Sequence, residues 1–208
     1  MEFIVEKIGM SRTVGEKSIP VTLLKIVPAK VCEVKEDGKA IVAYTKGKRV
    51  NKPVEGMQKK YGLSREFNRF VELKVANTEP GDLSVEPLKE AKKVKLTFKS
   101  KGRGFQGVVK RYGFAGGPGS HGSRFHRAPG SIGNCEFPGR VMPGKKMPGH
   151  YGNKNVTVNA EVVEFDPDMG VLVIKGSVPG ANGSFGKVRI VKWVRLKKLI
   201  NYQKIFKV

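Results

Sequence analysis

The chain is poor in acidic residues and in cysteine. Only 18 aspartates and glutamates stand against 40 lysines and arginines among 208 residues, so the formal net charge is +22. An excess of this size indicates a polyanionic partner, and phosphate backbones are the usual one. The two cysteines, Cys32 and Cys135, lack any metal-binding or redox spacing. We therefore expect reduced thiols in a cytoplasmic protein.

Long apolar runs are also missing. No segment approaches the roughly 18 apolar residues that a membrane-spanning helix needs. The first ten residues include acidic side chains and lack the apolar core of a signal peptide. An anionic membrane surface would require a basic amphipathic helix or a lipidation signal, and neither is clear. The sequence therefore favours a nucleic acid over a membrane as the polyanion.

The positive charge is concentrated in two segments. Residues 99–155, here called the extension, carry a net charge of +10, and residues 187–208 carry +8. The other 129 residues together carry only +4. The extension also holds fourteen glycines and five prolines, which disfavour helix and strand. Because a long irregular segment in a compact chain is usually functional or disordered, we interpret the extension as the functional part.

The sequence on both sides of the extension predicts a mainly β fold. Residues 53–61 indicate a short helix, and residues 65–75 a helical turn that leads into a strand at 70–75. The other expected strands are residues 19–27, 29–34, 40–45, 83–85, 94–98, 156–163, 171–175 and 188–191. Short strands with this spacing are typical of a closed or nearly closed barrel, which would take strands from both sides of the extension.

We divide the chain accordingly into four parts. The first part of the barrel spans residues 1–98 and contains a small α/β insertion at about 47–78. The extension follows at 99–155, the second part of the barrel at 156–194, and a basic tail at 195–208. In the tail, Leu196, Leu199 and Ile200 indicate one helical face.

One glycine motif raises the alternative of a nucleotide-binding enzyme. Gly102, Gly104 and Gly107 match G-x-G-x-x-G, but a dinucleotide site needs a full helix and an acid about 20 residues later. Gly113 would end such a helix after about two turns, and residues 122–127 contain no acid. The glycines fit a close approach of the backbone to phosphate better.

The three histidines do not indicate a metal site or a catalytic site. His121, His126 and His150 lack cysteine or carboxylate partners at ligand spacing, and Glu136 is the only acid near them in sequence. We expect no metal, no cofactor, no small-molecule substrate and no enzymatic activity. Histidines in such a segment fit contacts to nucleotides better.

Aromatic residues alternate with the cations of the extension, and this pattern is typical of a surface that binds nucleic acid. A DNA-reading module would present a helix or ribbon to the major groove, whereas an irregular loop fits folded RNA. The candidate RNA-binding residues are Lys101, Arg103, Lys110, Arg111, His121, Arg124, Phe125, His126, Arg127, Arg140, Lys145, Lys146, Tyr151 and Lys154.

Several motifs resemble the family of large-subunit ribosomal protein number three, in its bacterial form. The matching segments are residues 8–11, 100–107, 109–111, 121–123, 126–127, 129–133, 138–141, 144–147, 173–176 and 178–180, together with Gly149 and Gly152. The likeness covers nearly the whole chain. One departure lies at residues 134–137, where this chain has no glutamine; some relatives carry a methylated glutamine there.

The resemblance implies a structural role in the ribosome. It implies a barrel like those of translation factors, with a small α/β insertion, on the surface of the large subunit in the cytoplasm. The extension would reach through ribosomal RNA toward the peptidyl transferase centre. The family binds near the 3′ end of large-subunit ribosomal RNA early in assembly, with ribosomal proteins fourteen and nineteen as neighbours. An RNA chaperone outside the ribosome remains a further alternative.

The composition also predicts that residues 113–152 become ordered only when RNA is bound. Limited proteolysis of the free protein should then cut first within 113–152 and leave the barrel intact, and added RNA should protect the same sites. Resistance of this region to protease without RNA would contradict the prediction.

Overall fold

The computed structural model describes residues 1–14, 18–35, 38–75 and 79–191. Its barrel strands are β1 (Glu2–Thr13), β2 (Ile19–Ile26), β7 (Lys93–Lys99), β10 (Asn155–Asp166), β11 (Val171–Lys175) and β12 (Phe185–Ile190). They close in the order β1-β12-β7-β10-β11-β2, with antiparallel neighbours throughout. The expected mainly β fold, with barrel strands from both sides of the extension, is confirmed.

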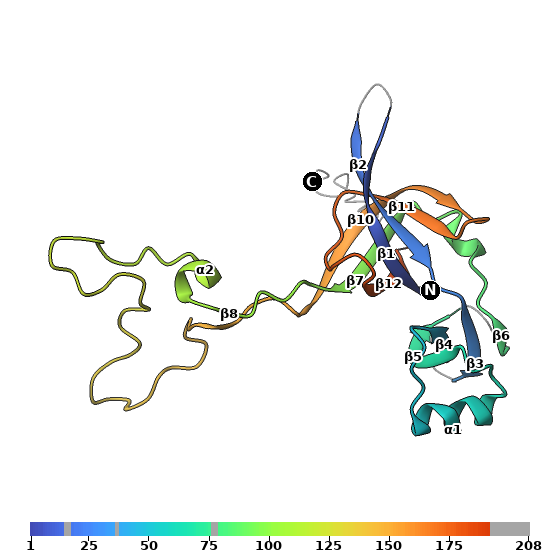
Figure 1. Cartoon of the computed structure of the whole chain (residues 1–208), viewed down its shortest axis with the longest axis horizontal. Helices are drawn as coiled ribbons and strands as arrows, with labels where there is room; N and C mark the ends of the chain where they lie inside the picture. Colours follow the sequence, from blue (N-terminus) through green and yellow to red (C-terminus); the bar gives the residue numbers. More distant parts are fainter. Residues whose placement is uncertain (15–17, 36–37, 76–78, 192–208) are drawn as a thin grey trace, which may run out of the picture.

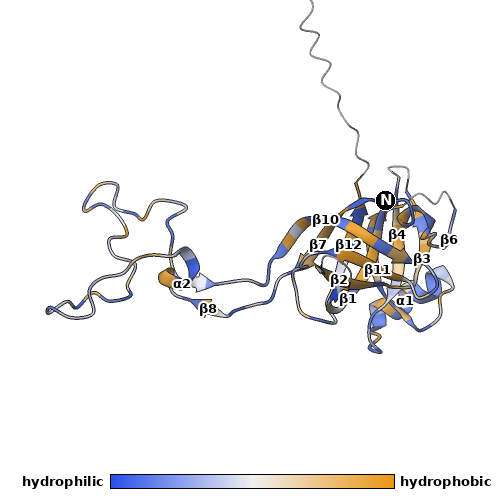
Figure 2. Cartoon of the chain, turned by 90° about the horizontal axis from the view of Figure 1, so that it is seen from above, coloured by the Kyte–Doolittle hydropathy of each residue, from blue (hydrophilic) through white to orange (hydrophobic). Residues whose placement is uncertain are grey.

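The core of the barrel follows from the alternation of side chains along its strands. Phe3 and Val5 of β1 point inward and join Leu96 of β7 and Leu172 of β11 in one buried cluster. The 3-10 helix η1 (Glu86–Leu88) adds Leu88, which is fully buried in the same cluster. Figure 2 shows apolar strands gathered in the barrel, whereas the extension is largely polar.

A second sheet packs on the outside of the barrel. It contains β3 (Ala29–Val34), β4 (Lys39–Thr45), β5 (Phe67–Lys74) and β6 (Gly81–Asp82) in the order β5-β4-β3-β6, and α1 (Lys52–Tyr61) lies between β4 and β5 in sequence. Ile4 lies between two inward-pointing residues of β1, so its side chain points outward. There it packs with Val31, Val42 and Leu73 of the second sheet. The buried run at the start of β1 therefore serves two cores.

The second sheet is wider than the sequence indicated. We expected residues 29–34 and 40–45 in the barrel and an α/β insertion at about 47–78, but β4 pairs with β5 and β3 pairs with β6, outside the barrel. The sheet thus spans residues 29–82. Runs of β-branched residues indicate a strand but do not indicate which sheet it joins, because that depends on distant parts of the chain.

Local signals were more successful at the ends of elements. Helix α1 has a proline in its first turn and ends at Gly62, which adopts the left-handed conformation, as expected. The strand expected at residues 83–85 is wrong, because Val85 has helical backbone angles and leads into η1 with its Pro87. The helical face expected at Leu196, Leu199 and Ile200 lies outside the described residues. No helix in the described ranges is long and apolar enough to span a membrane.

Candidate nucleic-acid interface

The extension begins and ends on neighbouring barrel strands. Lys99 at the end of β7 pairs with Asn155 at the start of β10. The pairing continues beyond the barrel, because the Arg103 N–H donates to the Tyr151 carbonyl at 2.8 Å and the Tyr151 N–H donates to the Gly104 carbonyl at 2.9 Å. The two-stranded ladder of β8 (Phe105–Gln106) and β9 (Gly149–His150) completes this stem, residues 99–106 and 149–155.

Gly152 allows the two chains of the stem to approach closely. Its φ of +76° lies in the left-handed region, and a Cβ at this position would overlap the carbonyl oxygen of Lys101. Any other residue would therefore be strained and would push the chains apart. The motif glycine at 152 thus has a structural explanation within this chain.

The short helix α2 (Val108–Tyr112) follows the stem. It has five residues and ends at Gly113, which adopts the left-handed conformation. A dinucleotide site needs a full helix after the glycine motif, so the G-x-G-x-x-G match does not form one here. Instead, the Arg111 Nη1 donates to the Met147 carbonyl at 2.6 Å and ties α2 to the returning chain.

Beyond α2 the chain forms two arms, residues 113–130 and 131–148, which project far from the barrel (Figure 1). Apart from α2 the segment from 107 to 148 has no helix or strand, as its glycines and prolines predict. The structure brings Lys101, Arg103, Arg111, Tyr151 and Lys154 together where the stem meets the barrel. It spreads the other nine predicted residues over α2 and the arms: Lys110, His121, Arg124, Phe125, His126, Arg127, Arg140, Lys145 and Lys146. All fourteen are exposed except Arg111, which is half-buried.

Two of the predicted residues also shape the first arm. The His126 Nδ1 lies 2.9 Å from the carbonyl oxygen of Pro118, and the Gly117 N–H donates to the His126 carbonyl at 2.8 Å. The Phe125 ring packs within 4 Å of where a Cβ would lie at Gly130, yet the side chain remains 40% exposed. Their expected contacts with bases or riboses stay a prediction.

Among the described residues, no acid forms an ion pair with a cation of the extension. The ion pairs within these ranges lie in the body of the molecule, such as Lys35 with Glu72 at 3.0 Å and Lys175 with Glu161 at 3.4 Å. None involves a residue of the extension, and its single acid, Glu136, is exposed. The unneutralised positive charge of the molecule is therefore largest on this projecting segment.

Aromatic rings lie beside several of these cations. The Arg103 guanidinium is 5.7 Å from the centre of the Tyr151 ring, and the Arg111 guanidinium is 5.0 Å from the centre of the Tyr112 ring. The His150 ring meets Phe105 edge-on, with 6.1 Å between centres. Tyr112 and His150 were not among the predicted site residues. The sequence signal for Tyr112 is its place directly after Lys110 and Arg111, among the aromatic residues that alternate with cations. The signal for His150 is that histidines of the extension fit contacts to nucleotides.

A buried lysine supports the base of the stem from inside the barrel. Lys7 is 6% exposed, and its Nζ donates to the carbonyls of Val178 at 2.7 Å and Gly180 at 3.2 Å. Burial lowers the pKa of the Lys7 ammonium, and the positive charge of Lys101 lowers it further. The lysine satisfies two carbonyls of a turn that packs against the stem.

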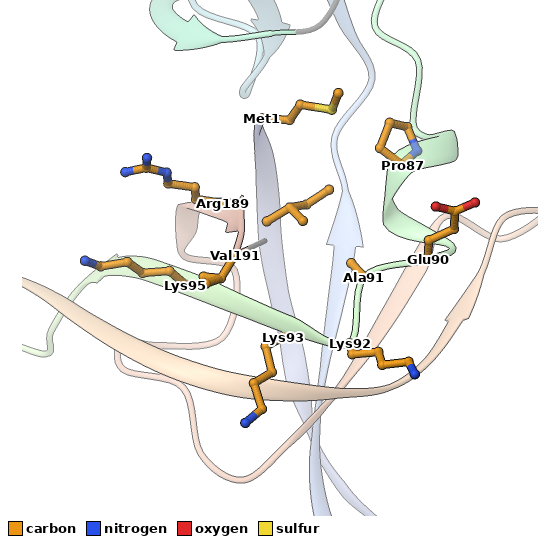
Figure 3. Close-up of a pocket in the computed structure, with 10 residues that line it drawn as sticks. Met1, Pro87, Glu90, Ala91, Lys92, Lys93, Lys95, Arg189 and Val191 are labelled. Carbon is orange, nitrogen blue, oxygen red and sulfur yellow. The ribbon is translucent and has the colours of Figure 1, made fainter. Parts of the chain in front are cut away.

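The remaining candidates for a site within the described residues are a metal cluster and a second cleft. Within the described residues, no three histidines, cysteines or carboxylates are close enough to hold a metal ion. A wide cleft of about 1100 Å³ lies at one end of the barrel beside Met1, Pro87 and Val191. The charged ends of Lys92, Lys93, Lys95 and Arg189 do not converge on one point there (Figure 3). A ligand pocket would normally aim several polar groups at one place.

Comparison with known proteins agrees with the geometry. The chain is 65% identical over 192 residues to large ribosomal subunit protein uL3 of Campylobacter jejuni; the aligned residues cover 92% of this chain and 100% of that protein. The uL3 of Helicobacter hepaticus is 62% identical over 192 residues, which again cover 92% of this chain and 100% of that protein. The uL3 of Thermotoga petrophila is 45% identical over 204 residues, 92% of this chain and 98% of that protein. The chain belongs to the uL3 family of large ribosomal subunit proteins.

The part of the chain that matches the uL3 family model contains the whole extension. The model, described as Ribosomal protein L3, matches residues 70–169. This range includes β7, which leads into the extension, and β10, which follows it. The segment that projects from the barrel thus lies inside the matched range, and the resemblance to this family is confirmed.

The close approach at Gly152 leads to a prediction for the stem. Replacement Gly152→Ala should lower the hydrogen-exchange protection of the Arg103 and Tyr151 amides by about tenfold or more, because left-handed strain costs about 1–3 kcal/mol and the new Cβ meets a carbonyl. The matched control is Gly144→Ala, where φ is +79° and nothing lies within 4 Å of the added Cβ. Unchanged protection in Gly152→Ala, or equal loss in both variants, would contradict this role.

Proposed function

We propose that the chain acts as a non-enzymatic constituent of the large ribosomal subunit, with the barrel as an anchor and the extension as the part that binds ribosomal RNA. The observation that carries the proposal is the stem with its two arms, which holds exposed cations without acidic partners. Ribosomal RNA is the polyanion that a protein of this family would meet. Folded RNA offers phosphates along irregular paths, which an irregular basic chain can follow.

The composition of the extension supports binding inside folded RNA. Its fourteen glycines let the backbone approach phosphate and ribose closely, and its exposed rings can stack on unpaired bases. The barrel and second sheet have their own buried cores, so they keep their shape without RNA. A rigid body with a basic projection fits an anchor on the subunit surface whose extension enters the RNA.

The finer parts of the proposal rest on the family resemblance. The extension reaches toward the peptidyl transferase centre, and the protein binds near the 3′ end of large-subunit ribosomal RNA early in assembly. Its protein neighbours are ribosomal proteins fourteen and nineteen, and its location is the cytoplasmic ribosome. The fourteen candidate residues of the extension, from Lys101 to Lys154, make the RNA contacts.

Co-sedimentation tests this proposal against the main alternative, an RNA chaperone outside the ribosome. The protein expressed in its own cells should remain with the large subunit after a high-salt wash, because a threaded extension is held by shape as well as by charge. A chaperone would be released by the wash and found across many RNAs. Release of most of the protein from the large subunit would overturn the proposal.

Salt dependence measures how many phosphates are contacted. If about ten phosphates are neutralised, the logarithm of the RNA affinity should fall with the logarithm of salt concentration with a slope on the order of −7 to −9. The double variant Arg140→Ala with Lys145→Ala should make the slope shallower by about 1.5, because two exposed cations of the second arm are lost.

A control with the same loss of charge keeps the salt experiment specific. Lys52→Ala with Lys59→Ala removes two exposed cations from α1, outside the extension, and should leave the slope unchanged. Equal effects of the two double variants would show that net charge matters and the extension does not. A slope near zero for the wild type would contradict electrostatic binding altogether.

A further inference from the structure

A cleft lies where the stem leaves the barrel, and we call it the root cleft. It has a volume of about 590 Å³. Four cations line it, Lys101, Arg103, Arg111 and Lys154, and no acid does. Three rings line it as well, those of Tyr112, His150 and Tyr151, and the turn at residues 178–180 forms its barrel side.

We propose that the root cleft receives a single unstacked nucleotide of ribosomal RNA, with its base against a tyrosine ring and its phosphate beside the cations. The proposal rests on the RNA-binding function proposed above and names one contact within it. It goes beyond general attraction to phosphate, because it assigns a base-binding place to residues that the charge pattern alone did not select.

The size and chemistry of the cleft fit one nucleotide. Pockets for small organic ligands measure roughly 300–1,000 Å³, and the root cleft lies within this range. A double helix could not enter such a space, whereas a base turned out of its stack could. The lining has positive charge for a phosphate and flat rings for a base, and it has no carboxylate that would repel the phosphate.

Two of the rings already lie beside cations. Arg103 lies near the Tyr151 ring and Arg111 near the Tyr112 ring, at 5.7 Å and 5.0 Å from the ring centres. The Tyr112 ring also has Lys146 and Phe114 as neighbours. Tyr151 is nevertheless 41% exposed and Tyr112 39% exposed, so part of each residue is accessible to a base, and stacking on aromatic side chains tolerates any base.

The barrel side of the cleft is rigid and electrostatically favourable for an anion. The carbonyls of Val178 and Gly180 accept hydrogen bonds from the buried Lys7 ammonium, so their negative ends are turned toward a cation. Gly180 has a φ of +98°, and a Cβ there would lie 2.9 Å from the Lys99 carbonyl oxygen. The turn is thus packed directly against the start of the stem, and the cleft is formed before any ligand arrives.

Burial lowers the pKa of Lys7, and the positive charge of Lys101 lowers it further, which agrees with a local excess of positive charge at the cleft. A phosphate in the cleft would relieve this repulsion as well as pair with the exposed cations. Both effects favour an anion in the cleft, and the rings that line it add a surface for a flat base.

Ultraviolet cross-linking of the full-length protein to large-subunit ribosomal RNA, followed by mass spectrometry, tests the proposal. We expect a cross-linked nucleotide on Tyr151 or Tyr112, from one position in the RNA. In binding assays, Tyr151→Leu with Tyr112→Leu should lower the RNA affinity by at least about fivefold, since about 1 kcal/mol or more of stacking is lost. The salt slope should stay the same, because no charge is removed.

The control for this experiment is Tyr61→Leu, which removes a ring from α1 and should leave the affinity unchanged. Wild-type affinity in the double variant, with cross-links only in the arms, would overturn the root cleft proposal and leave the RNA-binding function standing. If the wild-type protein showed no salt-dependent binding to ribosomal RNA, the RNA-binding function itself would be contradicted. Micromolar binding of free adenosine monophosphate in the root cleft that ribosomal RNA does not displace would also overturn the proposal, because the cleft would then serve a free nucleotide and not the RNA.

Discussion

The pairing of β7 with β10 determines how the extension leaves the barrel. These strands are neighbours in a closed barrel, and their ladder runs to Lys99 and Asn155 without interruption. The two ends of a 57-residue segment are therefore held one strand spacing apart. The stem continues this pairing as far as β8 and β9, so the arms begin at a defined distance and direction from the body. Without the closed barrel, the extension would have no fixed base.

The body of the molecule and the extension also differ in their electrostatics. Cations of the barrel and second sheet form ion pairs, for example Lys60 with Glu33 and Lys93 with Glu161, whereas those of the extension have no acid to pair with in the structure described. Exposed ion pairs add little stability, so pairing on the body chiefly reduces the attraction of its surface for other polyanions. In the proposed function, this contrast would direct RNA to the stem and arms. Charge distribution thus matters more here than the total net charge of +22.

Sequence reasoning succeeded where a signal is local and failed where contacts are distant. Gly62 and Gly113 were correctly expected to end helices, because a glycine that ends a helix in the left-handed conformation can be recognised from a few neighbouring residues. The placement of β3 and β4 in a second sheet with β5 and β6 was not predictable in this way, because it depends on contacts between distant residues of a second core. The root cleft was missed for the same reason. Its wall at residues 178–180 is about 75 residues away from Lys101 and Arg103 in sequence, and no local pattern joins them.

The stem and the arms differ in how much order they have before RNA binds. In the stem, backbone hydrogen bonds such as Arg103 to Tyr151 already fix the chain, and the buried Lys7 fixes the turn beside it. The arms have few such bonds, so in the proposed function RNA supplies most of their order and offsets the conformational entropy that they lose. Binding energy from a contact at the stem would be reduced less by this entropy than the same contact in an arm. The single stacked nucleotide proposed for the root would therefore fix the register of the RNA on the protein before the arms are threaded.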